Sequence, residues 1–435
     1  MDTATPTITK ASRMIKRGEL TPIELLETSL ARIKQFEPEV AAWVTIDEVG
    51  ARATAKKLTE EAVKGRIRSP LHGITVGVKD IFYTRGLQTT MGSPLYTGYV
   101  PDFDATVVAQ LRELGAIILG KTHTTEFASH DPAPTRNPWN ITHTPGGSSS
   151  GSAAAVAAGM ISLAIGTQTG GSVIRPAAYC GIVGVKPTYD LLSRDGIYPL
   201  SWSLDHVGLF TRNVEDAAIA LSALTDQKAP HSLKSPPRIG IPDRFFNEKT
   251  DRDSSEGYTK AVGLLERTGA KIIPFKLPNS FDLAPSVHRV IMSAEAATIH
   301  ERLFKTRADG YRPYIRGQVV SGLQINATTY IKAQRIAGRY RKDFEEAIKP
   351  FDAVATPSTT SSAPKGLEWT GDPALNSPWS LAGFPTITIP TNLSDKGLPL
   401  GLQLASPSET DSALFSVARW CEGKLNFRDS PVTTQ

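Results

Sequence analysis

Two serines that each follow a pair of glycines are the residues best suited to chemistry in this sequence. Gly-Gly-Ser ends at Ser148 and again at Ser172, within one segment rich in Gly, Ser and Ala. Paired glycines let the backbone adopt positive φ and approach a ligand closely. Consecutive N–H groups in such a turn can bind an anion, and in acyl transfer that anion is the tetrahedral oxyanion. The N–H groups predicted to hold it belong to Thr169, Gly170, Gly171 and Ser172.

A serine hydroxyl is a poor nucleophile unless a nearby base removes its proton, and Lys79 is the candidate base. It lies in Gly77-Val78-Lys79-Asp80, at the end of a short apolar run. Lysine can act as a base only when it is neutral, and burial favours that form by lowering its pKa. We therefore expect Lys79 to accept a proton from Ser148, and Ser148 to accept one from Ser172. The reverse relay would protonate the leaving amine.

These motifs resemble the hallmark of the amidase signature family. The resemblance implies that Ser172 is the nucleophile, that Ser148 is a relay serine held by a cis peptide bond, and that Lys79 is the base. It continues through residues 202–216 and into the C-terminal segments, so it covers most of the chain from Gly73 onward. It implies an amidase that hydrolyses carbon–nitrogen bonds in linear amides other than peptides, releasing ammonia or an amine.

Arg175 is a departure from the common family pattern, which places an arginine two positions after the nucleophile. Here the arginine follows at the third position, and Gln168 stands where many members carry aspartate. Both features resemble the malonamidase-like branch, in which the shifted arginine grips the substrate's carboxylate. The planar guanidinium suits a carboxylate because it can donate two parallel hydrogen bonds. The expected substrate is a small acid-bearing amide such as malonamate, bound by Arg175, Ala128 and Ser129; a purely structural role for Arg175 stays open.

Other functions are compatible with the same three catalytic residues. A carbamate, aryl-amide or ester hydrolase would share the acyl-enzyme chemistry, with Trp202, Trp369 and Trp379 as candidate pocket residues. A glutaminase-like amidotransferase subunit would work together with a partner protein. A silent binding protein is disfavoured, because all three catalytic residues are retained. A Ser-His-Asp triad is also disfavoured, since none of the eight histidines lies in a G-x-S-x-G-type context that would argue for one, and Cys180 fits packing better than nucleophilic attack.

The elements that must position these residues alternate along the chain. Thr21, Pro22 and Glu24 predict a capped helix start, and a second helix is expected over about 49–63, so that two helices form an N-terminal layer. From Gly73 onward, short apolar runs alternate with helical patterns. The strands expected are 74–78, 116–119, 161–165, 238–241, 271–274, 352–356, 386–389 and 400–404. This order predicts an α/β fold with a central mixed, mostly parallel β-sheet covered by α-helices on both faces.

The chain is expected to form a single domain over residues 1–435. Its parts would be the helical layer 1–65, a catalytic core 66–225 with the Gly- and Ser-rich signature, and a remainder 226–435 with substrate-side insertions. The stretch Pro357 to Asp372 is expected to be a surface loop. Residues 115–122 match the phosphate-loop pattern G-x-x-x-x-G-K-[ST]. Their middle residues are Ala, Ile, Ile and Leu, which predict a strand, so no loop remains to bind phosphate.

Composition narrows the class further. The 435 residues carry a net charge of only +5 and show no long basic run, which argues against nucleic-acid or membrane partners. Two cysteines cannot build a disulfide framework or a metal cluster, so neither a metal nor another cofactor is expected. No secretory signal or membrane-spanning run is evident, and the cytoplasm is the expected compartment. The expected ligand is a small-molecule amide; a homodimer is left open.

Overall fold

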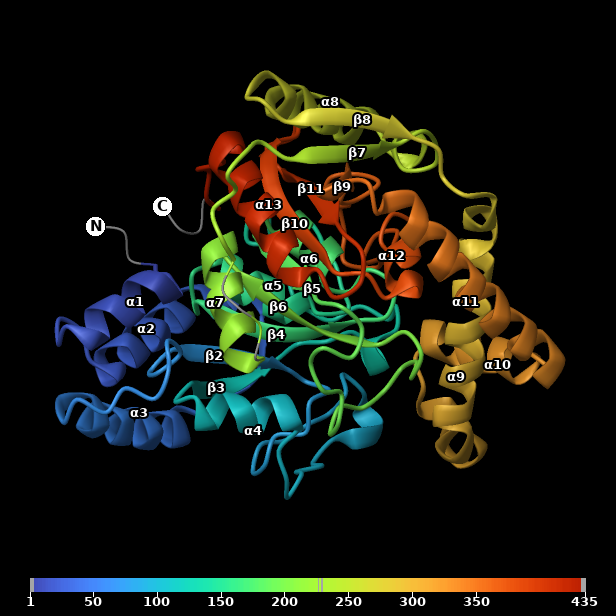
Figure 1. Cartoon of the computed structure of the whole chain (residues 1–435). Helices are drawn as coiled ribbons and strands as arrows, with labels where there is room; N and C mark the ends of the chain where they lie inside the picture. Colours follow the sequence, from blue (N-terminus) through green and yellow to red (C-terminus); the bar gives the residue numbers. More distant parts are fainter. Residues whose placement is uncertain (1–3, 226, 228–229, 432–435) are drawn as a thin grey trace.

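A computed structural model describes residues 4–225, 227 and 230–431 of the chain (Figure 1). The expected boundary at residue 226 lies outside these residues. Eleven strands of the described part join in one sheet, in the order β1-β3-β2-β4-β6-β5-β10-β11-β9-β7-β8. The strands are β1 (Trp43–Ile46), β2 (Thr75–Lys79), β3 (Ile117–Thr122), β4 (Leu163–Gln168), β5 (Val183–Lys186), β6 (His206–Thr211), β7 (Arg238–Pro242), β8 (Lys271–Phe275), β9 (Ala353–Pro357), β10 (Thr386–Leu393) and β11 (Pro399–Ala405).

The sheet is mixed and lies between helices, as predicted, but it is not mostly parallel. Of the ten strand pairings among the described residues, six are antiparallel and four are parallel. The parallel pairs are β3-β2, β2-β4, β9-β7 and β7-β8. The antiparallel strands β5 and β6 had not been recognised in the sequence, and they account for three of the six antiparallel pairings.

Helices cover both faces of the sheet. Successive residues of a strand point to opposite faces, and both faces carry buried apolar side chains. In β3, Ile117 and Leu119 join one buried cluster while Ile118 joins another. The first face carries α2 (Pro22–Val40), α3 (Glu48–Val63), α5 (Ser150–Ala157) and α6 (Ile174–Tyr179). The other carries α1 (Ile8–Lys16), α4 (Thr106–Glu113), α7 (Val214–Leu224), α8 (Arg252–Arg267) and α13 (Asp411–Leu425).

The N-terminal segment contains one helix more than the sequence predicted. Helix α2 begins at the expected capping box, in which Thr21 accepts from the Glu24 N–H while the Glu24 carboxylate accepts from Thr21. Helix α3 matches the second expected helix, and α1 is the addition. None of the described helices is long and apolar enough to cross a membrane.

A further group of helices lies at one end of the sheet, on the right of Figure 1. It comprises α9 (Ala284–Arg307), α10 (Pro313–Leu323), α11 (Ala327–Ile348) and the short α12 (Ser377–Ala382). Its core is aromatic: Phe344 packs against Trp379 with ring centroids 4.8 Å apart and against Tyr340 at 5.3 Å. The Glu295 carboxylate of α9 fastens this group to the segment before β6, accepting hydrogen bonds from the Ser201 hydroxyl and the Ser203 N–H.

Two segments that the sequence singled out take clear positions. Residues 117–122, within the phosphate-loop pattern, form strand β3, and Gly115 has positive φ just after α4. The segment 357–372 contains no helix or strand beyond the end of β9, as expected, but it is not simply a surface loop. Ser358 and Thr370 in it are buried, and Asp372 borders the cavity described below.

Candidate active site

Lys79 and Thr167 meet where the parallel strands β2 and β4 end. Because neighbouring parallel strands reach the same edge of a sheet, the last residues of both strands lie together. The Lys79 ammonium is 2.7 Å from the Ser148 hydroxyl oxygen and 2.8 Å from that of Thr167. Thr167 was not predicted from the sequence.

The electrostatic setting of Lys79 suits a base. Its side chain is fully buried, and this burial lowers its pKa to about 7, while the negative charge of Asp205 opposes the shift. The Asp205 carboxylate is itself buried and accepts hydrogen bonds from the Thr169 hydroxyl and from two backbone N–H groups. A substantial fraction of Lys79 is therefore neutral near pH 7.

The two predicted serines lie on adjoining loops. Ser148 precedes α5, and its peptide bond with Gly147 is cis, as the family resemblance implied. The Ser149 N–H donates to the Ser172 carbonyl over 3.4 Å, so the two loops touch. Among the described residues no hydrogen bond joins the Ser148 and Ser172 hydroxyls. The structure thus brings Lys79 into contact with Ser148 and places Ser172 beside them, at the floor of a cavity.

Three successive peptide units before Ser172 are held by their carbonyl groups. The His288 Nε2–H donates to the Thr169 carbonyl over 3.0 Å, and the Ser380 hydroxyl donates to the Gly170 carbonyl over 2.8 Å. The Gly171 carbonyl accepts from the Arg175 N–H. In a trans peptide the N–H points opposite to the C=O, so these contacts fix the directions of the next three N–H groups. In the described part of the chain, the N–H groups of Gly170, Gly171 and Ser172 donate no hydrogen bond.

At Gly171 this loop has no room for a larger residue. A Cβ on Gly171 would lie 2.5 Å from the Asn376 side-chain oxygen. Gln168 holds the end of this loop: its side-chain oxygen accepts hydrogen bonds from the N–H groups of Val173 and Ile174, at the start of α6. Its amide nitrogen donates to the Ser380 hydroxyl, which extends the network to α12. The uncommon Gln168 thus orders the chain around Ser172.

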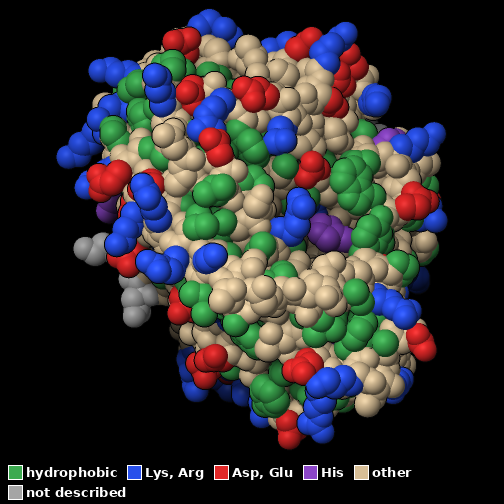
Figure 2. Space-filling model, turned by 90° about the vertical axis from the view of Figure 1, so that its right-hand side faces the viewer, with side chains coloured by type: hydrophobic (Ala, Val, Ile, Leu, Met, Phe, Trp, Pro, Cys, Tyr) green, Lys and Arg blue, Asp and Glu red, His purple; other side chains and the backbone are tan. Residues whose placement is uncertain are grey.

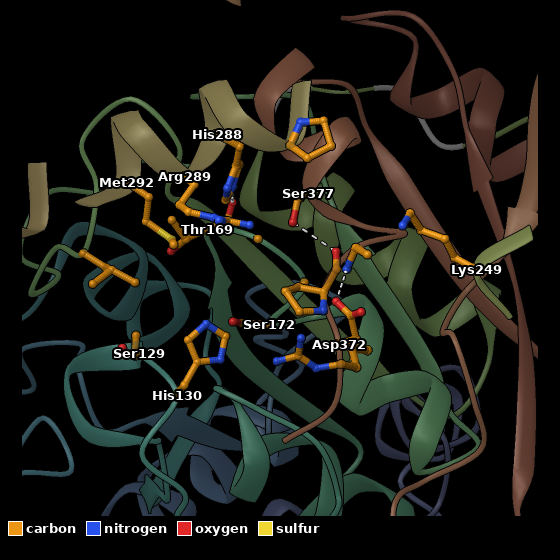
Figure 3. Close-up of a pocket in the computed structure, with 18 of the residues that line it drawn as sticks. Ser129, His130, Thr169, Ser172, Lys249, His288, Arg289, Met292, Asp372 and Ser377 are labelled. Carbon is orange, nitrogen blue, oxygen red and sulfur yellow. Dashed lines mark hydrogen bonds between the residues drawn. The ribbon is translucent and has the colours of Figure 1, made fainter. Parts of the chain in front are cut away.

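Ser172 opens into a cavity of about 450 Å³, shown with its lining residues in Figure 3. Residues 169–172 and Arg175 form part of its wall, together with Ala128 and Ser129. The Ser129 hydroxyl donates to Gln318 of α10, so it is already engaged. His130, next to Ser129, lines the cavity as well. The other lining residues were not predicted: Leu200, Phe245, Lys249, Pro285, His288, Arg289, Met292, Asp372, Pro373, Ala374 and Ser377.

Arg175 is buried at the wall of this cavity and is only partly satisfied. Its Nη2 donates to the Gly147 carbonyl over 2.8 Å and to the Thr370 hydroxyl over 3.2 Å. Its Nε and Nη1 have no hydrogen-bond partner among the described residues. Unpaired buried donors are rare in proteins, and in a cavity wall they suit an anionic ligand. The side chain thus has both structural contacts and free donors.

Several other candidates have structural contacts instead. Asp80 pairs with Lys121, whose nitrogen lies 3.3 Å from its carboxylate, and not with Lys79. The His206 Nδ1 lies 2.6 Å from the Leu204 carbonyl, and Cys180 is buried, which raises its thiol pKa. The three tryptophans considered for an aromatic pocket do not line the cavity: Trp202 and Trp369 are about half exposed, and Trp379 is in the core.

Comparison with known proteins places these features in a wider group. A family profile described as Amidase matches residues 24–415. A glutamyl-tRNA(Gln) amidotransferase subunit from Roseiflexus castenholzii is 35% identical over 463 residues, covering 94% of each chain. A crystal structure of an amidase superposes with a TM-score of 0.90 at 32% identity, covering 96% of this chain and all of that one. Peptide amidase from Stenotrophomonas maltophilia gives 0.84 at 29% identity and 98% coverage of both.

Proposed function

The chain belongs to the amidase family, and on that premise we propose that it hydrolyses an amide C–N bond through an acyl-enzyme on Ser172. The observation that carries the proposal is the buried Lys79, which is 2.7 Å from the Ser148 hydroxyl and has a pKa of about 7. A lysine that is largely charged could not take a proton from serine, whereas a base with a pKa near the working pH can.

The reaction begins with two proton transfers. Neutral Lys79 takes the Ser148 proton, Ser148 takes the Ser172 proton, and the Ser172 oxygen attacks the amide carbonyl carbon. The N–H groups of residues 169–172 stabilise the oxyanion that forms. When the C–N bond breaks, the relay returns a proton to the leaving nitrogen. Water then attacks the acyl-enzyme by the same route and releases the acid.

The acyl group that the site supports best carries a carboxylate. Arg175 has two unpaired buried nitrogen donors at the cavity wall, and it comes three residues after Ser172. A short amidated acid such as malonamate would place its carboxylate there, as in the malonamidase-like branch. Aryl amides and carbamates have less support, because the tryptophans lie elsewhere.

A second candidate is a glutaminase-like subunit that supplies ammonia to a partner protein. The amidotransferase relatives favour it over malonamate. The cavity also offers a reason: Asp372 lines it together with Arg175, and its charge acts on the guanidinium. Opposite charges side by side suit the carboxylate and ammonium groups of an amino acid such as glutamine.

An ammonia-release assay with the isolated chain separates these functions. We expect ammonia from malonamate or glutamine, little from a neutral aliphatic amide, and none with Ser172→Ala. Release from glutamine that depends on an added protein fraction would favour the amidotransferase role. Equal turnover of neutral and acidic amides would exclude the carboxylate clamp, and activity retained by Ser172→Ala would exclude the mechanism.

A further inference from the structure

The cavity beside Ser172 contains more positive charge than one substrate carboxylate would neutralise. Arg175, Lys249 and Arg289 line it, against a single carboxylate from Asp372. The two lining histidines add no charge at neutral pH: burial lowers the pKa of His130 to about 4 and also lowers that of His288. The chain as a whole is nearly balanced, with 48 basic and 43 acidic residues. The excess of two positive charges is therefore a local feature of the cavity.

The wider surface shows no comparable excess on the side of helices α9–α12. Figure 2 shows Lys and Arg side chains interspersed with Asp and Glu over this face, without a continuous field of one sign. Unbalanced charge within a concave site concentrates oppositely charged ligands more strongly than the same charges on an open surface. The charges of the cavity are thus placed where they act on a bound molecule.

Arg289 extends from the helix face that walls the cavity. Pro285, His288, Arg289 and Met292 follow the i, i+3, i+4, i+7 spacing of one face of α9, and all four line the cavity. His288 is buried and binds the Thr169 carbonyl, whereas Arg289 is exposed. This difference places Arg289 nearer to solvent, at the mouth of the cavity.

Lys249 stands across the cavity from Arg289. It ends the short helix η3 (Asn247–Lys249), and its ammonium lies 5.1 Å from the centroid of the Phe245 ring, which also lines the cavity. In Figure 3 the labelled Lys249 and Arg289 lie on opposite sides of the cavity, with Ser377 and Asp372 between them. Within the described part of the chain, neither side chain forms a salt bridge. Both cations are therefore available to a ligand.

The volume of the cavity also exceeds what a very small amide needs. Even if each of its roughly seven heavy atoms took up the about 30 Å³ of a whole water molecule, malonamate would fill less than half of the 450 Å³. Apolar side chains of Leu200, Phe245, Met292 and Pro373 line the cavity as well. The remaining space can hold an extension of the substrate that is apolar along its length and charged at its end.

We propose that the substrate is an amide with two acidic groups: one on the acyl part, held by Arg175, and one on the amine part, held at the mouth by Lys249 and Arg289. The inference rests on the proposed hydrolysis at Ser172. The two negative charges of this substrate would balance the two excess positive charges of the cavity. Hydrolysis breaks the C–N bond, adds the hydroxyl of water to the acyl carbon and protonates the nitrogen. The products are a dicarboxylic acid and an amine that bears its own acidic group, in the manner of an amino acid.

Three substrates that differ only at the amine test this proposal on the full chain: malonamate, its N-carboxymethyl derivative and its neutral N-carbamoylmethyl derivative. We expect the N-carboxymethyl compound to have a kcat/KM at least about tenfold above that of its neutral counterpart. Lys249→Gln and Arg289→Gln should each lower that value by about two- to fivefold, as a partly exposed ion pair allows. Both variants should lower kcat/KM less for malonamate, which has no acid on its amine part, than for the N-carboxymethyl compound. Lys332→Gln, which removes an exposed cation of α11 outside the cavity, should change none of the three.

Failure of this proposal can be told from failure of the hydrolase assignment. If the two variants slow all three substrates equally, the cations only attract anions and the second site does not exist. The same conclusion follows if the wild type shows no preference for the doubly acidic compound. If the wild type hydrolyses none of the three substrates, calorimetry with Ser172→Ala measures whether the N-carboxymethyl compound binds. The N-carboxymethyl compound should bind to Ser172→Ala about tenfold more tightly than to a variant that also carries Lys249→Gln and Arg289→Gln. That result would support the second site and show that only the proposed chemistry is wrong. Absence of binding to Ser172→Ala would overturn the proposal.

Discussion

In the proposed mechanism, the protonation state of Lys79 controls whether Ser172 can react. Burial lowers its pKa from 10.5 to about 7, so it loses its proton within the physiological range. Because only the neutral amine can accept the Ser148 proton, kcat/KM should rise with pH through about 7 and level off above about 8. A pH–rate profile between pH 5.5 and 9 measures this rise of kcat/KM with pH. A rate that does not fall at pH 5.5 would mean that another group is the base.

Asp205 gives a second test of the same residue. Its negative charge opposes the lowering of the Lys79 pKa. Asp205→Asn should therefore move the rise of kcat/KM to lower pH, by roughly half a pH unit to one unit. Asparagine can keep a hydrogen bond with the Thr169 hydroxyl, which limits structural damage. If the rate falls but kcat/KM still rises at the same pH, Asp205 serves only to hold the Thr169 loop by hydrogen bonds.

His288 should act as a positioning residue for the N–H groups that face the substrate. Its Nε2–H holds the Thr169 carbonyl and thereby orients the Gly170 N–H. We expect His288→Ala to lower kcat by about tenfold or more with a smaller change in KM, since loss of an aligned oxyanion donor acts mainly in the transition state. His288→Gln, which keeps a donor of similar reach, should recover part of the loss. Equal losses in the two variants would indicate a packing role only.

At this scale the sequence predicted what depends on local motifs. Ser148, Ser172 and Lys79 could be named because glycine pairs and short flanking patterns mark them. His288 and Ser380 could not, because each reaches the loop from a segment more than one hundred residues away. Nothing in their immediate neighbourhood along the chain distinguishes them from other polar residues of a helix.

Among the elements, strand existence was easier to predict than strand direction. The expected strands at β2, β3 and β4 are present, with bounds shifted by a few residues. Alternation of strands and helices favours parallel pairing, but β6 enters the sheet between β4 and β5 and runs antiparallel to both. Its position depends on contacts across the sheet, which alternation along the chain does not encode.

The helices at one end of the sheet were the largest omission. No prediction covered α9 to α11, although Pro285 and Pro313 lie in first helical turns and Asn326 caps α11. Helix α9 is buried on more than one side, against α10, α11 and the segment before β6, so a single apolar stripe is missing from its sequence. Because this group supplies His288, Arg289 and Met292, the sequence left one wall of the cavity undefined.

Glu295 should hold that group of helices in place. Its buried carboxylate accepts from the Ser201 hydroxyl at 2.6 Å, the Ser203 N–H at 2.9 Å and the Tyr330 hydroxyl at 2.7 Å. Glu295→Ala leaves these donors without their acceptor and should lower the free energy of unfolding by about 2–4 kcal/mol. Glu295→Gln should cost less, since one oxygen remains. Urea denaturation measures both, and a change below about 0.5 kcal/mol for alanine would contradict this role.

For the whole molecule, buried basic groups should make stability depend on pH. Burial lowers the pKa of Lys79 and Lys186 to about 7 and that of Lys121 to about 8. Between these values and 10.5 the unfolded chain binds protons that the native chain does not, so the free energy of unfolding rises with pH across this window. Burial also lowers the pKa of His123 and His300 to about 4, which adds a loss of stability as pH falls from 6.5 to 4.

The free energy of unfolding should therefore increase from pH 7 through pH 8 to pH 9, where the lysines dominate; below pH 7 the raised pKa of Glu422, about 7, opposes the histidines. Urea denaturation at these three values tests the trend, with Lys186→Met as the informative variant. Removing that buried amine should raise stability at pH 7 and flatten the slope between pH 7 and 9, without touching the groups assigned to catalysis. A free energy of unfolding that falls between pH 7 and pH 9 would contradict the protonation states described above.

The central claim is that Ser172 is the nucleophile and that Lys79 and Ser148 activate it. A fluorophosphonate probe followed by peptide mapping in a mass spectrometer measures this most directly, on the wild type and on Lys79→Met, Ser148→Ala and Ser172→Ala. The account predicts a single adduct on Ser172 in the wild type, labelling slowed by at least about a hundredfold in the first two variants, and none in the third. An adduct on another residue, or undiminished labelling of Ser172→Ala, would contradict it.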